Sequence, residues 1–137
     1  MSRIIEVSLT LRGFERSPVE ACRMLGSGSA ELRQKGQRIN GISEATFKDS
    51  SVREEITLLT SESLSEGVAR LARLWGGWTR IGSVIRRCAV VHVELDIFVR
   101  DGVGSIEQPS FFLDVETIAA LASVSGTVSF AYQPKLP

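Results

Sequence analysis

The residues best suited to chemistry stand together at His92, Glu94 and Asp96, where they alternate with apolar residues. Because successive strand side chains point to opposite faces, all three would lie on one face of one strand. An imidazole and two carboxylates form a ligand set for a divalent metal. Neighbours on such a face are roughly 6.6–6.8 Å apart, so one ion would need further ligands, such as Glu6, from a paired strand. A solvated outer sheet face is the simpler interpretation, and we expect no cofactor.

Catalytic motifs are incomplete elsewhere in the chain. Residues 92–94 match the H-x-E of zinc deaminases, but the accompanying P-C-x-x-C is absent. There is one histidine and no G-x-S-x-G elbow, so no serine triad can be assembled. Cys22 and Cys88 fall on apolar patterns that predict core positions. The glycine-rich segment 25–29 follows a predicted helix and lacks G-K-[ST], which indicates a helix end and not a phosphate loop. We therefore expect a protein that is not an enzyme.

A basic cluster gives a different kind of candidate site. Arg80, Arg86 and Arg87 follow Trp78, which comes directly after two glycines and is either an exposed anchor or a lid on the preceding helix. Arginine beside tryptophan anchors protein interfaces or stacks on nucleic-acid bases. The 16 basic and 16 acidic residues leave no net charge to attract nucleic acid. We therefore expect Trp78, Arg80, Arg86 and Arg87 to contact another protein.

The first half of the chain predicts a strand and a helix before a long loop. Apolar residues alternate with polar ones from Ile5 to Leu11, which is typical of a half-buried strand. Ser17 and Pro18 predict the start of a helix that ends at Gly26, with Val19, Cys22 and Leu25 as its apolar stripe. Residues 27–51 are expected to form a long loop, and residues 55–60 a short strand.

The second half predicts two further helices and two further strands. Ser63 and Glu66 predict a capping box for a helix whose apolar stripe runs to Trp75, with Glu66 paired to Arg70. A long strand is expected over residues 88–100, and a short extended piece over 109–113. Asp114 then caps a third helix, and a last strand follows over 127–133, before a tail at 134–137. The expected stripe of the third helix is Val115, Ile118, Leu121 and Ala122.

These elements predict one α+β domain over residues 1–137. Alternation on three strands is typical of a sheet that is covered on one face only. The expected architecture is a two-layer sandwich, with a mostly antiparallel sheet of four to five strands and three helices on one face. With 43% hydrophobic residues the chain can build a core. No apolar run approaches the roughly 20 residues of a membrane span, and no signal peptide opens the chain, so we expect a cytoplasmic protein with no membrane partner.

The order of short motifs resembles the domain-of-unknown-function family 4279. The resemblance is carried by an alternating strand that ends in Leu11-Arg12-Gly13-Phe14, followed by Pro18, Leu25-Gly26 and Lys35-Gly36. A leucine-rich helix over 64–75, a long hydrophobic strand over 90–99, Pro109 before a helix, and Tyr132 on the last strand continue it. The resemblance implies a compact bacterial or phage domain with no catalytic motif to transfer.

Three functions remain open from the sequence. The first is a non-enzymatic protein–protein interaction module of the inhibitor, immunity or adaptor type, which is an analogy to other small neutral α+β domains. The second is a domain that binds a small ligand or a metal on the outer sheet face or in the middle loop. The third is self-association into a homodimer through a sheet face or an edge strand.

Overall fold

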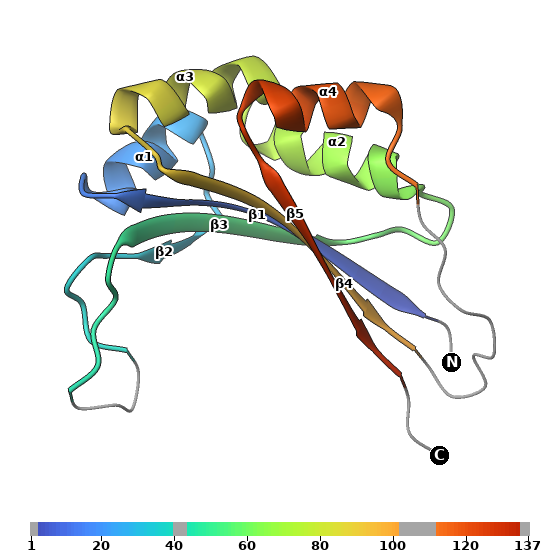
Figure 1. The fold of residues 1–137 in the computed structure, drawn as a ribbon, viewed down its shortest axis with the longest axis horizontal. Coiled ribbons are helices and arrows are strands. Elements are labelled where there is room, and N and C mark those ends of the chain that lie inside the picture. The colour runs from blue at the N-terminus through green and yellow to red at the C-terminus, as the bar shows by residue number, and fades with distance from the viewer. Residues whose placement is uncertain (1–2, 40–43, 102–111, 135–137) are drawn as a thin grey trace.

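The computed structural model of the chain describes residues 3–39, 44–101 and 112–134. Five strands and four helices follow one another in these residues (Figure 1). In chain order they are β1 (Ile4–Phe14), α1 (Pro18–Leu25), β2 (Glu31–Arg33), β3 (Ser50–Thr57), α2 (Leu64–Leu74), α3 (Trp78–Cys88), β4 (His92–Arg100), α4 (Val115–Ser123) and β5 (Thr127–Gln133).

The strands form one sheet in the order β2-β3-β1-β4-β5. All neighbours are antiparallel except β4 and β5, which α4 connects as parallel strands. The four helices lie on the same side of this sheet, and its other face carries no helix from the described residues (Figure 1). The predicted α+β fold with a mostly antiparallel sheet is therefore confirmed, with four helices in place of the expected three.

The core lies between the central strands and α2. Val7, Leu9 and Leu11 of β1 are at most 1% exposed, and they alternate with side chains on the outer face. Helix α2 begins with the predicted capping box between Ser63 and Glu66. The stripe predicted for this helix is buried, which confirms its orientation; its members are Leu64, Val68, Leu71, Ala72 and Trp75. Burial of this stripe is what holds the helix layer on the sheet.

Helix α3 was not predicted. The sequence analysis began the long strand at Cys88, but residues 78–88 are helical and β4 begins only at His92. Ile81, Val84 and Cys88 are buried at three- and four-residue spacing, so this segment carries a helical period. The helix ends at Ala89, which adopts a left-handed conformation with φ of 54°. The expected loop over 27–51 is also corrected, because it contains β2 and the start of β3.

Three predictions about helix surfaces were wrong. Val19 of α1 is 51% exposed, and Val115 and Ile118 of α4 are 81% and 53% exposed, so neither predicted stripe is buried as a whole. Of the α4 stripe Leu121 is buried, whereas Ala122 is exposed. Both helices lie at the rim of the helix layer, where only part of each helix meets the core. Likewise, Arg70 pairs with Glu62 at 2.9 Å and not with Glu66.

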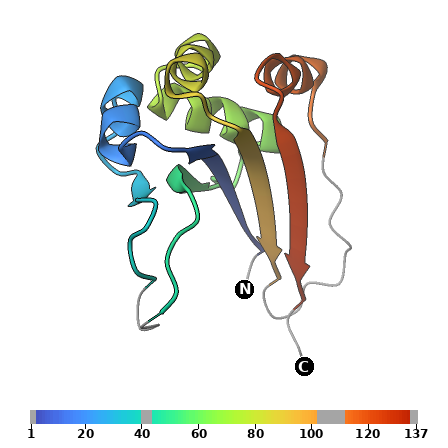
Figure 2. The same cartoon turned by 60° about the vertical axis from the view of Figure 1, so that its left-hand side comes forward.

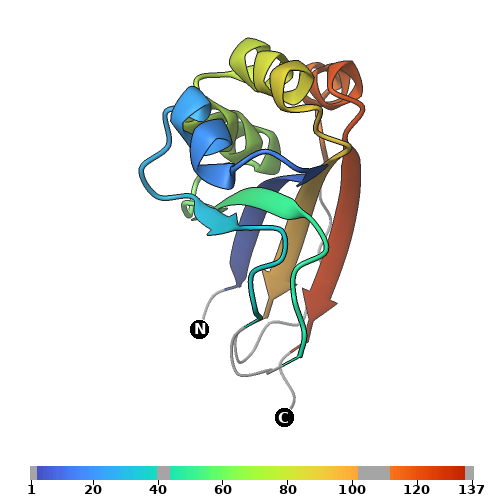
Figure 3. The ribbon, with the colours of Figure 1, turned by 90° about the vertical axis from the view of Figure 1, so that its left-hand side faces the viewer.

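The end of the sheet formed by β4 and β5 extends beyond the helix layer. Figure 2 shows both strands running side by side past the helices, with β5 at the edge. Figure 3 shows the same strands projecting away from the helices that cover the other end. None of the helices in the described ranges has the length and apolar character needed to cross a membrane. Most of the piece expected at 109–113 lies outside the described residues.

Candidate interaction surfaces

The candidate metal-binding row of His92, Glu94 and Asp96 lies on the outer face of β4, where the alternation of the sequence placed it. Glu94 accepts from Arg12 of β1, with 2.8 Å between its Oε1 and Nη2, and Asp96 accepts from the hydroxyl of Ser129 on β5. His92 stands opposite Arg12 across the β1–β4 pair and is exposed. The two carboxylates are therefore engaged by different neighbouring strands.

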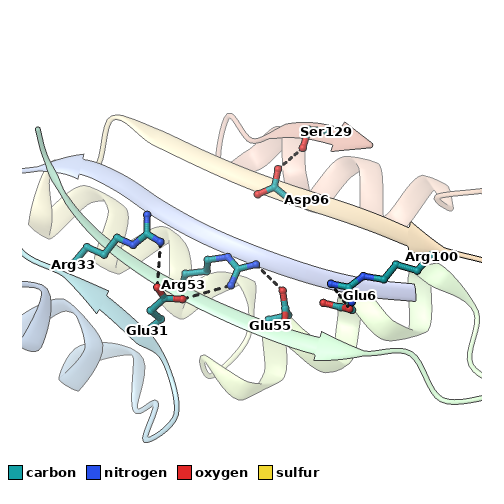
Figure 4. A network of polar contacts seen from close by, with 8 residues as sticks. All are labelled: Glu6, Glu31, Arg33, Arg53, Glu55, Asp96, Arg100 and Ser129. Atoms are coloured by element: carbon teal, nitrogen blue, oxygen red, sulfur yellow. Dashed lines mark hydrogen bonds and ion pairs between the residues drawn. The ribbon is translucent and has the colours of Figure 1, made fainter. Parts of the chain in front are cut away.

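Further ion pairs cross the same face (Figure 4). Arg53 of β3 lies between Glu31 of β2, at 3.6 Å, and Glu55 of its own strand, at 2.6 Å. Strands β1 and β4 do pair, which is the condition for Glu6 to join the row, but Glu6 meets Arg100 of β4 at 3.4 Å and so binds an arginine there. Two of these pairs connect neighbouring strands and one lies within β3, so most of the charge on this face is balanced within the sheet.

No three histidine, cysteine, aspartate or glutamate side chains in the described part of the chain are grouped so as to share a metal ion. The geometry explains this for the predicted row. Each carboxylate is turned toward a donor on another strand, so a metal would have to displace an arginine and a serine. Losing a charge-assisted bond of this kind opposes binding.

A hollow of about 520 Å³ opens on the outer face beside these pairs. It is lined by Thr10 and Ser51 of the sheet and by Ile39 and residues 46–49 of the segment between β2 and β3, which include Phe47. Arg33 lies over the Phe47 ring, with 5.1 Å from its guanidinium carbon to the ring centroid. The hollow therefore combines the outer sheet face with the middle loop, the two places that the sequence suggested for a small ligand.

The residues predicted to bind a partner lie on the other side of the molecule, in the helix layer. Trp78 is the first residue of α3, and its side chain packs against the core while remaining partly exposed. Arg80 is exposed, and its side chain lies along Gly76 at the end of α2 and reaches Gly26 at the end of α1. Arg80 therefore lies where the ends of α1 and α2 meet α3.

Arg86 and Arg87 occupy the last turn of α3 and are exposed. Arg87 lines a shallow hollow between α3 and α1 that also contains Arg16, Glu20, Arg23 and Met24. Helix α1 packs on α3 there, with Cys88 Sγ 4.0 Å from Met24 Sδ. The packing of α1 on α3 therefore brings Arg16 and Arg23 beside Arg87. Both are more than sixty positions from Arg87 in the chain, so the sequence alone did not place them together.

The charges of this helix surface differ from those of the sheet face. Arg16 pairs with Glu20 at 3.2 Å. Within the described part of the chain, four neighbouring arginines have no ion-pair partner; these are Arg23, Arg80, Arg86 and Arg87. We name Arg23, Arg80, Arg86 and Arg87 the arginine surface. Their positive charge is offset by no carboxylate within 4 Å, in contrast to the arginines of the sheet face.

Cys88 is buried in the core, and Cys22 is partly buried against it. Burial raises the pKa of both thiols above the ordinary value, and for Cys22 the carboxylate of Glu54 raises the pKa further. A thiol with a raised pKa holds little of the reactive thiolate at neutral pH. Both side chains instead contribute to the packing of α1 and α3.

A buried carboxylate that the sequence analysis missed anchors the glycine-rich segment. Glu54 of β3 is 5% exposed and faces the helix layer. Its carboxylate accepts from Ser27 Oγ at 2.6 Å, Ser29 Oγ at 2.8 Å and Trp75 Nε1 at 3.3 Å. The segment after α1 is therefore tied to the sheet. The predicted inward position of Ile56 already indicated that Glu54, two residues earlier, shares its face.

Comparison of the chain with models of known protein families, with curated proteins and with solved structures found no match. The resemblance to family 4279 rests on the residues quoted for it.

Proposed function

We propose that this chain is a non-enzymatic interaction module whose arginine surface binds an acidic region of another protein. The observation that carries the proposal is the set of four arginines on α1 and α3 that lack an ion pair among the described residues. Most arginines elsewhere in the described part of the chain are held by neighbouring carboxylates, as Arg12 and Arg53 are, although Arg38 and Arg73 also lack an ion pair. Unpaired guanidinium groups keep all their donors for an external carboxylate, and arginine dominates the energetics of many interfaces.

The hollow between α1 and α3 supports a protein partner over a nucleic acid. Besides arginines it contains Glu20 and Met24, a mixture of charged and apolar groups that suits the side chains of a protein. Toward a phosphate backbone, the carboxylate of Glu20 would be repulsive and Met24 would make no polar contact. The chain as a whole is neutral, so it offers no wider field to a polyanion. A compact arginine surface of this kind would increase the association rate with an acidic protein and make binding sensitive to salt.

The test uses a charge reversal with a matched control. Arg86→Glu with Arg87→Glu reverses two charges on the arginine surface. Arg38→Glu with Lys48→Glu makes the same change in charge at two exposed positions of the segment between β2 and β3. Proteins retained by the wild-type chain from its native host would be identified by mass spectrometry, and each would then be purified and titrated against all three chains in a calorimeter.

We expect at least one purified acidic protein to bind the wild type and the control alike, and to bind the double glutamate variant of α3 about tenfold more weakly or worse. Thermal melting of each variant would confirm that it is folded. Equal binding by all three chains, or a loss only in the control, would contradict the proposal. Retention of nucleic acid that a nuclease abolishes would replace the protein partner with a polynucleotide.

The hollow on the outer face favours a second function, which is binding of a small polar ligand. Its volume of about 520 Å³ falls within the range of roughly 300–1,000 Å³ that is usual for ligand sites. Its lining of arginine, carboxylate and hydroxyl groups suits a ligand that carries charges of both signs. Amide chemical shifts clustered at Thr10, Ser51 and Phe47 on addition of a compound would support this function, whereas shifts spread over the helices would not.

A further inference from the structure

The edge strand β5 lacks the features that protect the edges of sheets. It runs beside β4 in continuous parallel register from Thr127 to Gln133 with no bulge. Its seven residues include no charged side chain and no proline. Among the described residues no strand pairs with its other side. Natural edges are commonly shortened, charged, bulged or interrupted by proline, because an open row of backbone donors and acceptors attracts another strand.

The opposite edge of the same sheet shows such protection. Strand β2 has only three residues, and two of them, Glu31 and Arg33, are charged. Glu31 is paired with both Arg33 and Arg53, so the side chains at this edge are engaged in ion pairs. The contrast between the two edges points to β5 as the one that receives a further strand.

The side chains of β5 add an apolar face to the open edge. Val128, Phe130 and Tyr132 are 47%, 50% and 43% exposed. They stand in register with buried residues of β4, namely Leu95, Ile97 and Val99. They therefore continue the apolar face of the sheet onto β5, the strand that runs past the helix layer (Figures 2 and 3). A strand placed beside β5 would extend that face by one more row.

We infer that β5 pairs antiparallel with β5 of a second copy of this chain, about a twofold axis near Phe130. In that register Val128 of each copy stands opposite Tyr132 of the other, so apolar side chains meet apolar side chains on one face. On the other face Ser129 stands opposite Ala131. A second copy matches both rows without a third component, and no like charges meet because the strand has none.

The dimer joins the two five-stranded sheets into one and leaves the arginine surface free. Helix α1 packs on β2 and β3, at the end of the sheet remote from β5. The two arginine surfaces would therefore lie toward opposite ends of the assembly, each open to its own partner. The inference stands on the edge strand alone and is independent of the function proposed for α1 and α3.

The test is the mass of the purified chain in solution, measured by sedimentation over a range of concentrations. We expect the wild type to approach twice 15.0 kDa and the variant Ser129→Lys with Ala131→Lys to remain a monomer, because lysines would then face lysines across the axis. Thr57→Lys, at an exposed strand position away from this edge, is the control and should dimerise like the wild type.

A wild-type chain that stays monomeric at every accessible concentration would overturn the inference. So would a dimer that the two lysines leave intact, because it would then use another surface. Thermal melting of the lysine variant checks that it is folded. If the variant is unfolded, hydrogen exchange of the wild type gives the answer. Protection of the β5 amides that rises with protein concentration supports the dimer, and protection that does not change with concentration excludes the dimer.

Discussion

Replacing Glu54 with alanine should cost far more stability than replacing its neighbour Glu55. Glu54 is buried and accepts from two serine hydroxyls and the indole N–H of Trp75. Trp75 is fully buried, so its indole N–H would be left without an acceptor, which costs about 1–3 kcal/mol. Ser27 and Ser29 are partly exposed and can turn to water, so each loses only the net value of its bond, about 1 kcal/mol.

The expected total for Glu54→Ala is therefore about 3–5 kcal/mol of unfolding free energy. Glu55 is the matched control, because it is exposed on the opposite face and forms an ion pair with Arg53 at 2.6 Å. An exposed pair of this kind contributes about 0–1 kcal/mol, so Glu55→Ala should be nearly neutral. Urea unfolding of both variants, followed by tryptophan fluorescence, measures the difference.

A double-mutant cycle with Trp75→Phe isolates the bond to the indole. If Glu54 stabilises the fold through that bond, the cost of Glu54→Ala should fall by about 1–3 kcal/mol in the Trp75→Phe background. Equal costs for Glu54→Ala and Glu55→Ala would refute the argument that the carboxylate anchors the segment after α1. Strict additivity in the cycle would refute the part assigned to Trp75.

Three further predictions concern the core, the end of the sheet and the metal. Leu71→Ala should lower the unfolding free energy by about 2–5 kcal/mol, and Trp78→Ala by clearly less because Trp78 is only partly buried; denaturant titration compares them. Hydrogen bonds from Arg3 and Tyr132 lower the pKa of Asp101 from its ordinary 3.8, so its contribution to stability is complete above that pH and is lost as the pH falls through the folded pKa. Asp101→Asn should therefore flatten the acid limb of a plot of stability against pH, and an unchanged limb would contradict this. Zinc or manganese should leave the melting temperature unchanged. A rise in the melting temperature that His92→Ala abolishes would instead show that the row binds metal.

The elements that local chemistry specifies could be predicted from the sequence. The alternation in β1 and the capping box of α2 depend on residues close together in the chain, and both are present in the structure. Helix α3 is hard to predict because Gly76 and Gly77 indicate the end of a helix, although Ile81 and Val84 repeat at helical spacing beyond them. Gly77 instead lies at the N-terminal end of α3, with φ of 92°.

Features that depend on distant contacts could not be predicted in the same way. Helix α4 is apolar around much of its surface, so its sequence did not indicate which side meets the core, and Val115 and Ile118 proved exposed. Of the partner-binding candidates, Arg86 and Arg87 lie together as the sequence suggested. Arg23 lies near them only because α1 packs against α3. The spacing of residues in the chain does not predict that contact.

The most direct test of the central proposal is hydrogen exchange of the complex between this chain and its purified protein partner. We predict that binding slows exchange at the backbone amides of α1 and of the last turns of α3, around Arg23 and Arg87, and leaves residues 44–49 unchanged. Slowed exchange confined to residues 44–49 and the outer face of the sheet, with α1 and α3 unaffected, would contradict it.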